Sequence, residues 1–156
     1  MTKILLSLHA LAAVLTIGPV AVAASMFPKA LRHLHSAPGA SGALAGLRTL
    51  HRICRIYAGV AIVVPLFGLA AASSLGVLGS GWLITSIILT TAAAAILGLL
   101  ILPAQESALT AAQAPDAGPD VHLPTTRLAM LTGVFNLLWA TVTVLMIVRP
   151  GSTTGA

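Results

Sequence analysis

The longest uncharged stretch of this chain lies between Arg55 and Glu106 and contains no Asp, Glu, Lys or Arg. One membrane crossing needs only about 20 apolar residues, at about 1.5 Å of rise each. The stretch is therefore long enough for two crossings, and the glycine-rich segment 76–81 in its middle predicts the turn between them. A hydrophobic content of 58% and a charged content of 7% agree with a chain that folds in a bilayer.

The hydrophobic segments predict an all-α fold, a four-helix transmembrane bundle that forms a single domain over residues 1–156. We expect its helices at residues 4–27, 56–75, 82–102 and 127–148. Pro28 and Pro103 are expected to end the first and third helices, because proline cannot donate a helical hydrogen bond. Residues 28–55 and 103–126 are then two loops on the same side of the membrane.

The positions of the cations predict the orientation of this bundle. Lys3 and Arg149 lie on one side, and six cations lie in or beside the two loops on the other side: Lys29, Arg32, Arg48, Arg52, Arg55 and Arg127. The positive-inside rule places the two loops in the cytoplasm and both termini outside the inner (plasma) membrane. An alternative stays open, because the apolar run that ends in Ala21-Val22-Ala23 is also typical of a cleavable signal peptide. Its removal would put the first loop outside.

Composition excludes several classes of function. The net charge of +5 does not predict nucleic-acid binding, because the cations flank hydrophobic segments, where they face lipid headgroups. The single cysteine, Cys54, excludes an intramolecular disulfide and a thiolate metal cluster within one chain. The sequence has no P-loop, dinucleotide-binding glycine motif or serine-nucleophile elbow, so we predict neither a catalytic residue nor a metal site.

Small residues predict how the helices pack, because close contact replaces the hydrophobic effect as the cause of helix association in lipid. The second and third helices carry such residues at four-residue spacing: Gly68, Ala72 and Gly76, then Thr90, Ala94 and Gly98. We expect these two faces to pack against each other. Pro19 and Pro65 lie inside the first and second helices and predict kinks.

The two predicted loops differ in character. In the first loop, apolar residues recur every three positions from Leu44 to Ile53, with arginines on another side. This pattern predicts an amphipathic helix at the headgroup layer, leading into the second membrane helix. Residues 103–126 are rich in Ala, Pro and Asp and have no apolar periodicity, which predicts a mobile loop.

His9 is the first candidate site residue. An ionisable group inside a membrane helix is costly and usually faces the protein interior or water. One interpretation is structural: His9 bonds to the hydroxyl of Ser86 or Thr143, which lie at a similar predicted depth, or it lies near enough to the interface to contact water. The other is a role in binding a ligand or handling a proton, because a neutral imidazole has a free ring nitrogen.

Polar residues near the middle of the fourth helix form a second candidate. Asn136 and Trp139 lie one turn apart, and Thr143 extends the same stripe. An amide at that depth needs a partner within the bundle, which is either another helix or a substrate. If the bundle contains a cavity, we expect Asn136, Trp139, Thr143 and Ser86 to line it.

The arginines before the second helix form a third candidate. Spacings of four and three place Arg48, Arg52 and Arg55 on one side of a helix, and His51 is expected to gather with them. Such a cluster can hold an anionic headgroup or an acidic substrate group through charge-assisted hydrogen bonds. The alternative is that these arginines serve only as the topology signal.

The segment 5–15, in which Leu8-His9 is followed by small residues, resembles the opening helix of a broad group of small bacterial membrane proteins. The arginines at 48–55 and the Pro- and Gly-containing helix at 63–68 are similar to the same group. It includes the copper-resistance D-type proteins and the membrane-embedded protoporphyrinogen oxidase. Over most of its length, the chain most resembles an uncharacterised four-helix family known only as predicted integral membrane proteins.

The resemblance also implies a cofactor. In the oxidase branch the helix-one histidine is implicated in haem binding, so the resemblance implies His9 as a haem ligand. A lysine in a later helix also matters in that branch, whereas this chain has no lysine beyond Lys29. It also lacks the methionine- and histidine-rich route that copper transfer would use.

The sequence thus predicts a small polytopic inner-membrane protein of unknown specific function, which acts without catalysis as an accessory or binding component. Its expected partners are membrane lipids and either another membrane protein or a second copy of the chain. One alternative is a haem-binding redox protein that uses His9. A second alternative is a transporter of small solutes or lipids, with the prolines as hinges and Arg48, Arg52 and Arg55 as the capture site.

Overall fold

The computed structural model describes residues 2–36, 42–113 and 125–151. Within these ranges the elements are α1 (Thr2–Ser36), α2 (Ala43–Val60), α3 (Val63–Leu75), α4 (Gly81–Ala95), the π-helix η1 (Ile96–Ile101), α5 (Leu102–Gln113) and α6 (Thr125–Val148). The predicted all-α class is confirmed. The described residues form four stretches long and apolar enough to cross a membrane: Thr2–Leu34, Ala43–Leu75, Gly81–Gln113 and Thr125–Val148. The chain is therefore a multi-pass membrane protein.

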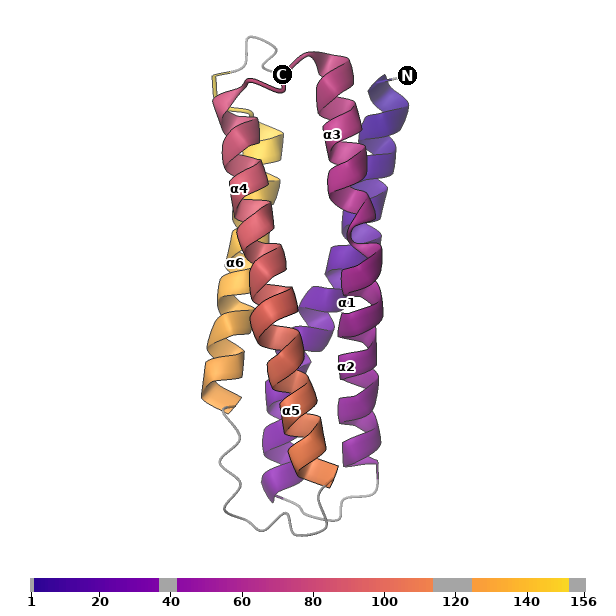
Figure 1. The fold of residues 1–156 in the computed structure, drawn as a ribbon, viewed down its shortest axis with the longest axis vertical. Coiled ribbons are helices and arrows are strands. Elements are labelled where there is room, and N and C mark those ends of the chain that lie inside the picture. Colours follow the sequence, from indigo (N-terminus) through magenta and orange to yellow (C-terminus); the bar gives the residue numbers. More distant parts are fainter. Residues whose placement is uncertain (1, 37–41, 114–124, 152–156) are drawn as a thin grey trace.

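The spans run up and down the length of the bundle, and α1 contacts most of the others (Figure 1). It packs against α2, α3 and α6, while α4 packs against α6 and α5 packs against α2. One end of the bundle contains the start of α1, the turn from α3 to α4 and the end of α6 (Figure 1). At the other end α1 and α5 finish and α2 and α6 begin. We call it the basic end, because the half of the bundle beside it carries the six cations Lys29, Arg32, Arg48, Arg52, Arg55 and Arg127.

Three of the four spans are longer than the sequence predicts, mainly at the basic end. α2 contains the helix that the sequence predicts from Leu44 to Ile53. α1 continues past Pro28 to Ser36, and the third span continues past Pro103 to Gln113, so the predicted loops are wrong over these residues. The rest of the second loop, residues 114–124, lies outside the described residues. A span of 33 residues is about 50 Å long, against about 30 Å for the hydrocarbon core. These helices therefore extend beyond the hydrocarbon at the basic end.

Pro28 does not end α1, and burial of its neighbours gives the physical reason. Phe27 and Leu31 are both buried, with exposed fractions of 0% and 1%. Both side chains pack in the core of the bundle, and this packing contributes to the stability of the helix on either side of Pro28. That contribution offsets the cost of about 3 kcal/mol for a proline inside a helix.

Pro103 does not end its helix either, because the turn before it widens. η1 has π-helical geometry, and the N–H of Leu102 bonds to the carbonyl oxygen of Leu97, five residues earlier. A wider turn of this kind accommodates the missing proline N–H while the helical path continues. The span therefore carries α5 past the point where the sequence predicts a loop.

The helix is interrupted just before Pro65, where the sequence predicts a kink. α2 ends at Val60, and α3 begins at Val63. Pro65 cannot donate to the carbonyl of Ala61, so the N–H of Val64 bonds to that carbonyl instead, at 3.0 Å. The predicted turn at 76–81 is also present, where Gly76 ends α3 in the left-handed conformation with φ 68°.

The expected contact between the small-residue faces of the second and third helices is wrong. α3 has α1 as its main neighbour, and α4 has α6. A Cβ at Gly68 would lie 2.8 Å from His9, whereas a Cβ at Gly98 would have no heavy atom within 4 Å. The two helices joined by the short turn therefore pack against different neighbours.

The buried core lies between α1, α2, η1, α5 and α6. It includes Phe27, Leu47, Cys54, Ile101 and Phe135. Large apolar side chains also cover the outside of the bundle, as Leu99 and Ile147 show, with exposed fractions of 73% and 76%. Such surfaces suit contact with lipid tails.

Candidate functional site

His9 faces α3 and is partly buried. Its Nδ1 atom lies 2.9 Å from the carbonyl oxygen of Val64, so an Nδ1–H group can donate to that oxygen. Gly68, one turn further along α3, leaves the space that the ring fills, because a Cβ there would lie 2.8 Å from His9 Cε1. A backbone carbonyl and a glycine thus fix the orientation of the imidazole.

The predicted hydrogen bond from His9 to Ser86 or Thr143 is not formed. Ser86 is fully buried and donates to the carbonyl of Trp82 at 2.8 Å. Thr143 is exposed and donates to the carbonyl of Trp139 at 2.9 Å. Because a hydroxyl in a helix can bond to the carbonyl four residues earlier, neither side chain needs His9 as a partner.

The bond to Val64 leaves the Nε2 lone pair of His9 without a partner in the described residues. A histidine that binds a metal commonly donates its other ring N–H to a backbone carbonyl, so His9 would hold a metal or haem iron through Nε2. Among the described residues, no three His, Cys, Asp or Glu side chains gather as a metal site. His9 would therefore be one ligand, and the described part of the chain gives no second histidine beside it.

The two faces of α2 differ as the sequence predicts. Its buried residues are Leu47, His51 and Cys54. Its exposed face carries the three arginines Arg48, Arg52 and Arg55. The expectation that His51 gathers with these arginines is wrong, because its position in the helical period places it on the buried face, with an exposed fraction of 8%.

His51 belongs to a buried polar cluster that joins α2 to α5. Its Nδ1 lies 3.1 Å from Oε1 of Gln105, and Nε2 of Gln105 donates to Sγ of Cys54 at 3.7 Å. Sγ of Cys54 in turn lies 4.0 Å from the carbonyl oxygen of Val20 on α1. Gln105 and Cys54 are both fully buried. The cluster therefore connects three helices through polar atoms in an apolar core.

Gln105 is not among the site residues that the sequence predicts. The available signal was its position, a polar amide at the end of the uncharged stretch and two residues after Pro103. Because the sequence predicts a loop at this position, it does not predict that Gln105 lies on the buried face of a helix.

The polar stripe of α6 forms the interhelical bond that one interpretation predicts. Nδ2 of Asn136 donates to Oγ of Ser25 on α1 at 3.0 Å. Trp139 packs edge-on against Phe135, with ring centroids 6.3 Å apart. Oδ1 of Asn136 and Nε1 of Trp139 are buried without a partner among the described residues.

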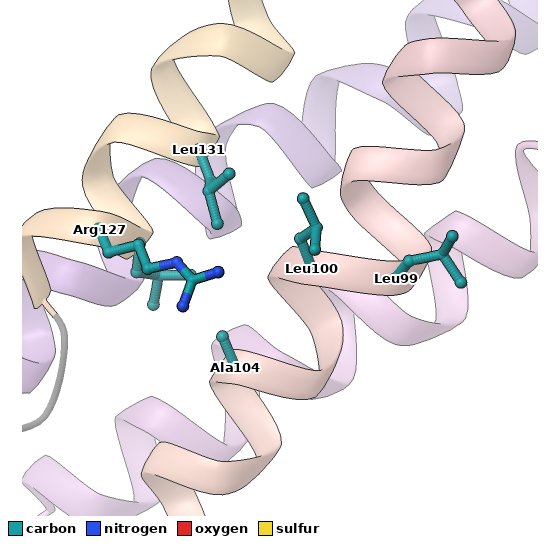
Figure 2. Close-up of a pocket in the computed structure, with 6 residues that line it drawn as sticks. Leu99, Leu100, Ala104, Arg127 and Leu131 are labelled. Carbon is teal, nitrogen blue, oxygen red and sulfur yellow. The ribbon is translucent and has the colours of Figure 1, made fainter.

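A recess of about 170 Å³ opens between the third and fourth spans. Its lining residues are Leu99, Leu100, Ala104, Arg127, Leu128 and Leu131. Asn136, Trp139, Thr143 and Ser86 are not among them. Figure 2 shows Arg127 extending from α6 into the space between the two spans, with Leu100 and Ala104 on the opposite side. One cation therefore lies beside an otherwise apolar hollow.

Comparison of the chain with protein-family models, curated proteins and solved structures gives no match. The functional interpretation therefore depends on the residues and their geometry.

Proposed function

We propose that this protein is a non-catalytic binding component of the plasma membrane, and that its basic end binds anionic lipid headgroups on the cytoplasmic side. The orientation follows from the positive-inside rule, because six of the eight Lys and Arg residues lie beside the basic end. The proposed ligand, an anionic lipid headgroup, follows from the exposed arginines at that end.

The division of α2 into two faces carries this proposal. His51 and Cys54 anchor one face in the bundle, so the arginines on the other face point away from the core. The guanidinium groups of Arg48, Arg52 and Arg55 lie along one side of the helix, and each can form two parallel hydrogen bonds to a phosphate. Near an anionic membrane surface, each cation contributes about 1 kcal/mol of attraction.

The lipids that the purified protein retains test this function. We would reconstitute it in nanodiscs that contain phosphatidylglycerol and phosphatidylcholine, extract it in mild detergent and quantify the lipids that remain bound. Nanodiscs expose both membrane surfaces, so an effect of the arginines on insertion in the cell does not influence the result.

We expect the wild type to retain more phosphatidylglycerol than phosphatidylcholine. The variant Arg48→Gln/Arg52→Gln/Arg55→Gln should lose most of this excess. The variant with lysine at all three positions keeps the charge, and Lys3→Gln changes a cation near the other end. Both controls should retain the excess. Equal retention by the wild type and the glutamine variant would contradict the proposal and leave the arginines as a topology signal.

Haem binding through His9 is the second candidate function, and the bond between His9 and Val64 is the observation that favours it. That bond engages Nδ1, so Nε2 is the ring atom that would hold an iron centre, which would supply redox chemistry when bound. The test is the visible absorption spectrum of protein expressed with ample haem. A Soret band that shifts on reduction and disappears in His9→Ala would support this function, and a colourless wild type would exclude it.

A further inference from the structure

The recess beside Arg127 begins at the level of the lipid headgroups. α6 has 24 residues and is about 36 Å long, only slightly more than the hydrocarbon thickness of about 30 Å. Arg127 is the third residue of this helix and is exposed. Its guanidinium therefore lies near the boundary between headgroups and hydrocarbon.

The body of the recess extends from that boundary toward the hydrocarbon. Leu131 lies four residues, or about 6 Å, deeper on α6 than Arg127. Leu100 lies the same number of residues deeper than Ala104 on the neighbouring span, which runs in the opposite direction (Figure 2). Leu99 and Leu100 have exposed fractions of 73% and 40%, so this wall is open to the surrounding acyl chains.

The charge at the headgroup end of the recess, beside Arg127, favours the binding of an anion. None of the lining residues is acidic. Glu106 follows Ala104 by two residues, which places it about 200° around α5 and on the far side from the recess. The backbone N–H groups of the first turn of α6 add partial positive charge beside Arg127.

We infer that the recess binds one anionic phospholipid, with its phosphate on the Arg127 guanidinium and an acyl chain along Leu99, Leu100 and Leu131. A phosphodiester accepts two parallel hydrogen bonds from a guanidinium group. The apolar wall lies at the depth where the chain of that same lipid begins. This site is separate from the α2 arginines, because its lining residues come only from η1, α5 and α6.

Native mass spectrometry of the detergent-purified protein tests the site. Phosphatidylglycerol, which is anionic, and phosphatidylcholine, which has no net charge, would be titrated separately with identical acyl chains, so that only the headgroup differs. We expect one phosphatidylglycerol to bind more tightly than the rest, and Arg127→Gln to weaken it about fivefold, the effect of losing one cation near a phosphate. Ala104→Phe, which fills the recess, should weaken the same lipid. Arg32→Gln, an exposed cation on α1, should leave it unchanged.

Two affinity results would each overturn this inference, apart from the comparison with the α2 variant described below. One is equal affinity of the wild type for the two lipids. The other is unchanged phosphatidylglycerol affinity in Arg127→Gln together with tighter binding in Asp116→Asn/Asp120→Asn. That result would mean that acidic groups of the chain, and not the lipid phosphate, interact with Arg127. A helical circular dichroism spectrum like that of the wild type, required of each variant, excludes loss of the fold as the cause.

The outcome also separates this site from the proposed function. Arg48→Gln/Arg52→Gln/Arg55→Gln should still bind the one tight phosphatidylglycerol. If that variant loses every phosphatidylglycerol while Arg127→Gln loses none, the recess site is excluded and the binding surface on α2 stands.

Discussion

Nδ1 of His51 lies 3.1 Å from Oε1 of Gln105, in the interior of the bundle near its basic end. The contact joins α2, most of which the sequence predicts to be helical, to α5, where the sequence predicts a loop. It depends on the π-helical turn η1, which carries the helix past Pro103 and brings Gln105 into the core. The basic end is therefore a packed structure that can present its arginines at fixed positions.

The first prediction concerns this polar contact. Gln105→Ala should lower the free energy of unfolding by about 1–3 kcal/mol, because it leaves a buried ring nitrogen of His51 without its partner. The measurement is unfolding in SDS titrations followed by circular dichroism. Gln113→Ala, an exposed glutamine on the same helix, is the matched control and should change stability little. Equal effects of the two substitutions would show that the contact adds no stability.

The second prediction concerns Gly68, the glycine beside the His9 ring. In an exposed helix Gly→Ala stabilises by about 1 kcal/mol. At Gly68 the new Cβ would lie 2.8 Å from the His9 ring, so Gly68→Ala should instead destabilise by about 1–3 kcal/mol.

Gly59→Ala provides the comparison for this prediction. A Cβ at Gly59 would have no heavy atom within 4 Å, so the substitution there should be neutral or stabilising. The loss in Gly68→Ala should also largely disappear when His9→Ala is present in the same chain. Additive effects of the two substitutions would refute the contact.

The third prediction concerns the bond between Asn136 and Ser25. Ser25→Ala should destabilise the bundle by about 1 kcal/mol, because it removes the one partner that the described residues give the Asn136 amide. Asn136→Leu should abolish the effect of Ser25→Ala. Thr141→Ala, whose exposed hydroxyl bonds within its own helix, is the control. A double-mutant cycle of unfolding free energies measures the coupling.

The fourth prediction concerns topology. A C-terminal alkaline phosphatase fusion should be active and a C-terminal green fluorescent protein fusion dark, because the C-terminus is expected outside. Fusions placed within 114–124 should behave in the opposite way. A mature protein that lacks the first helix by mass would instead support the signal-peptide interpretation of residues 1–23.

The membrane-spanning part of the fold could be predicted because it depends on composition along the chain. The uncharged stretch, the glycines at 76–81 and Pro65 each predict a feature that the structure contains. The continuation of α1 past Pro28 and of the third span past Pro103 could not be predicted in this way. Pro28 and Pro103 normally end helices, and only burial of Phe27 and Leu31 and the wider turn of η1 allow the chain to continue.

Some features of the candidate sites could likewise be predicted from the sequence, and others could not. The exposed face of Arg48, Arg52 and Arg55 follows from helical spacing alone. The partners of His9 and His51 depend on which helices are neighbours, and sequence spacing does not determine that. The recess beside Arg127 requires both the position of η1 and its pairing with α6, so no local pattern predicts it.

Lipid selectivity in the membrane tests the central claim most directly. Spin-labelled phosphatidylglycerol and phosphatidylcholine would be compared by electron paramagnetic resonance in membranes that contain the protein, and the motionally restricted fraction of each lipid measured. We predict a several-fold preference for phosphatidylglycerol in the wild type, reduced to nearly none when Arg48, Arg52, Arg55 and Arg127 are all replaced by glutamine. The absence of any preference in the wild type would contradict a role for the basic end in binding anionic lipids.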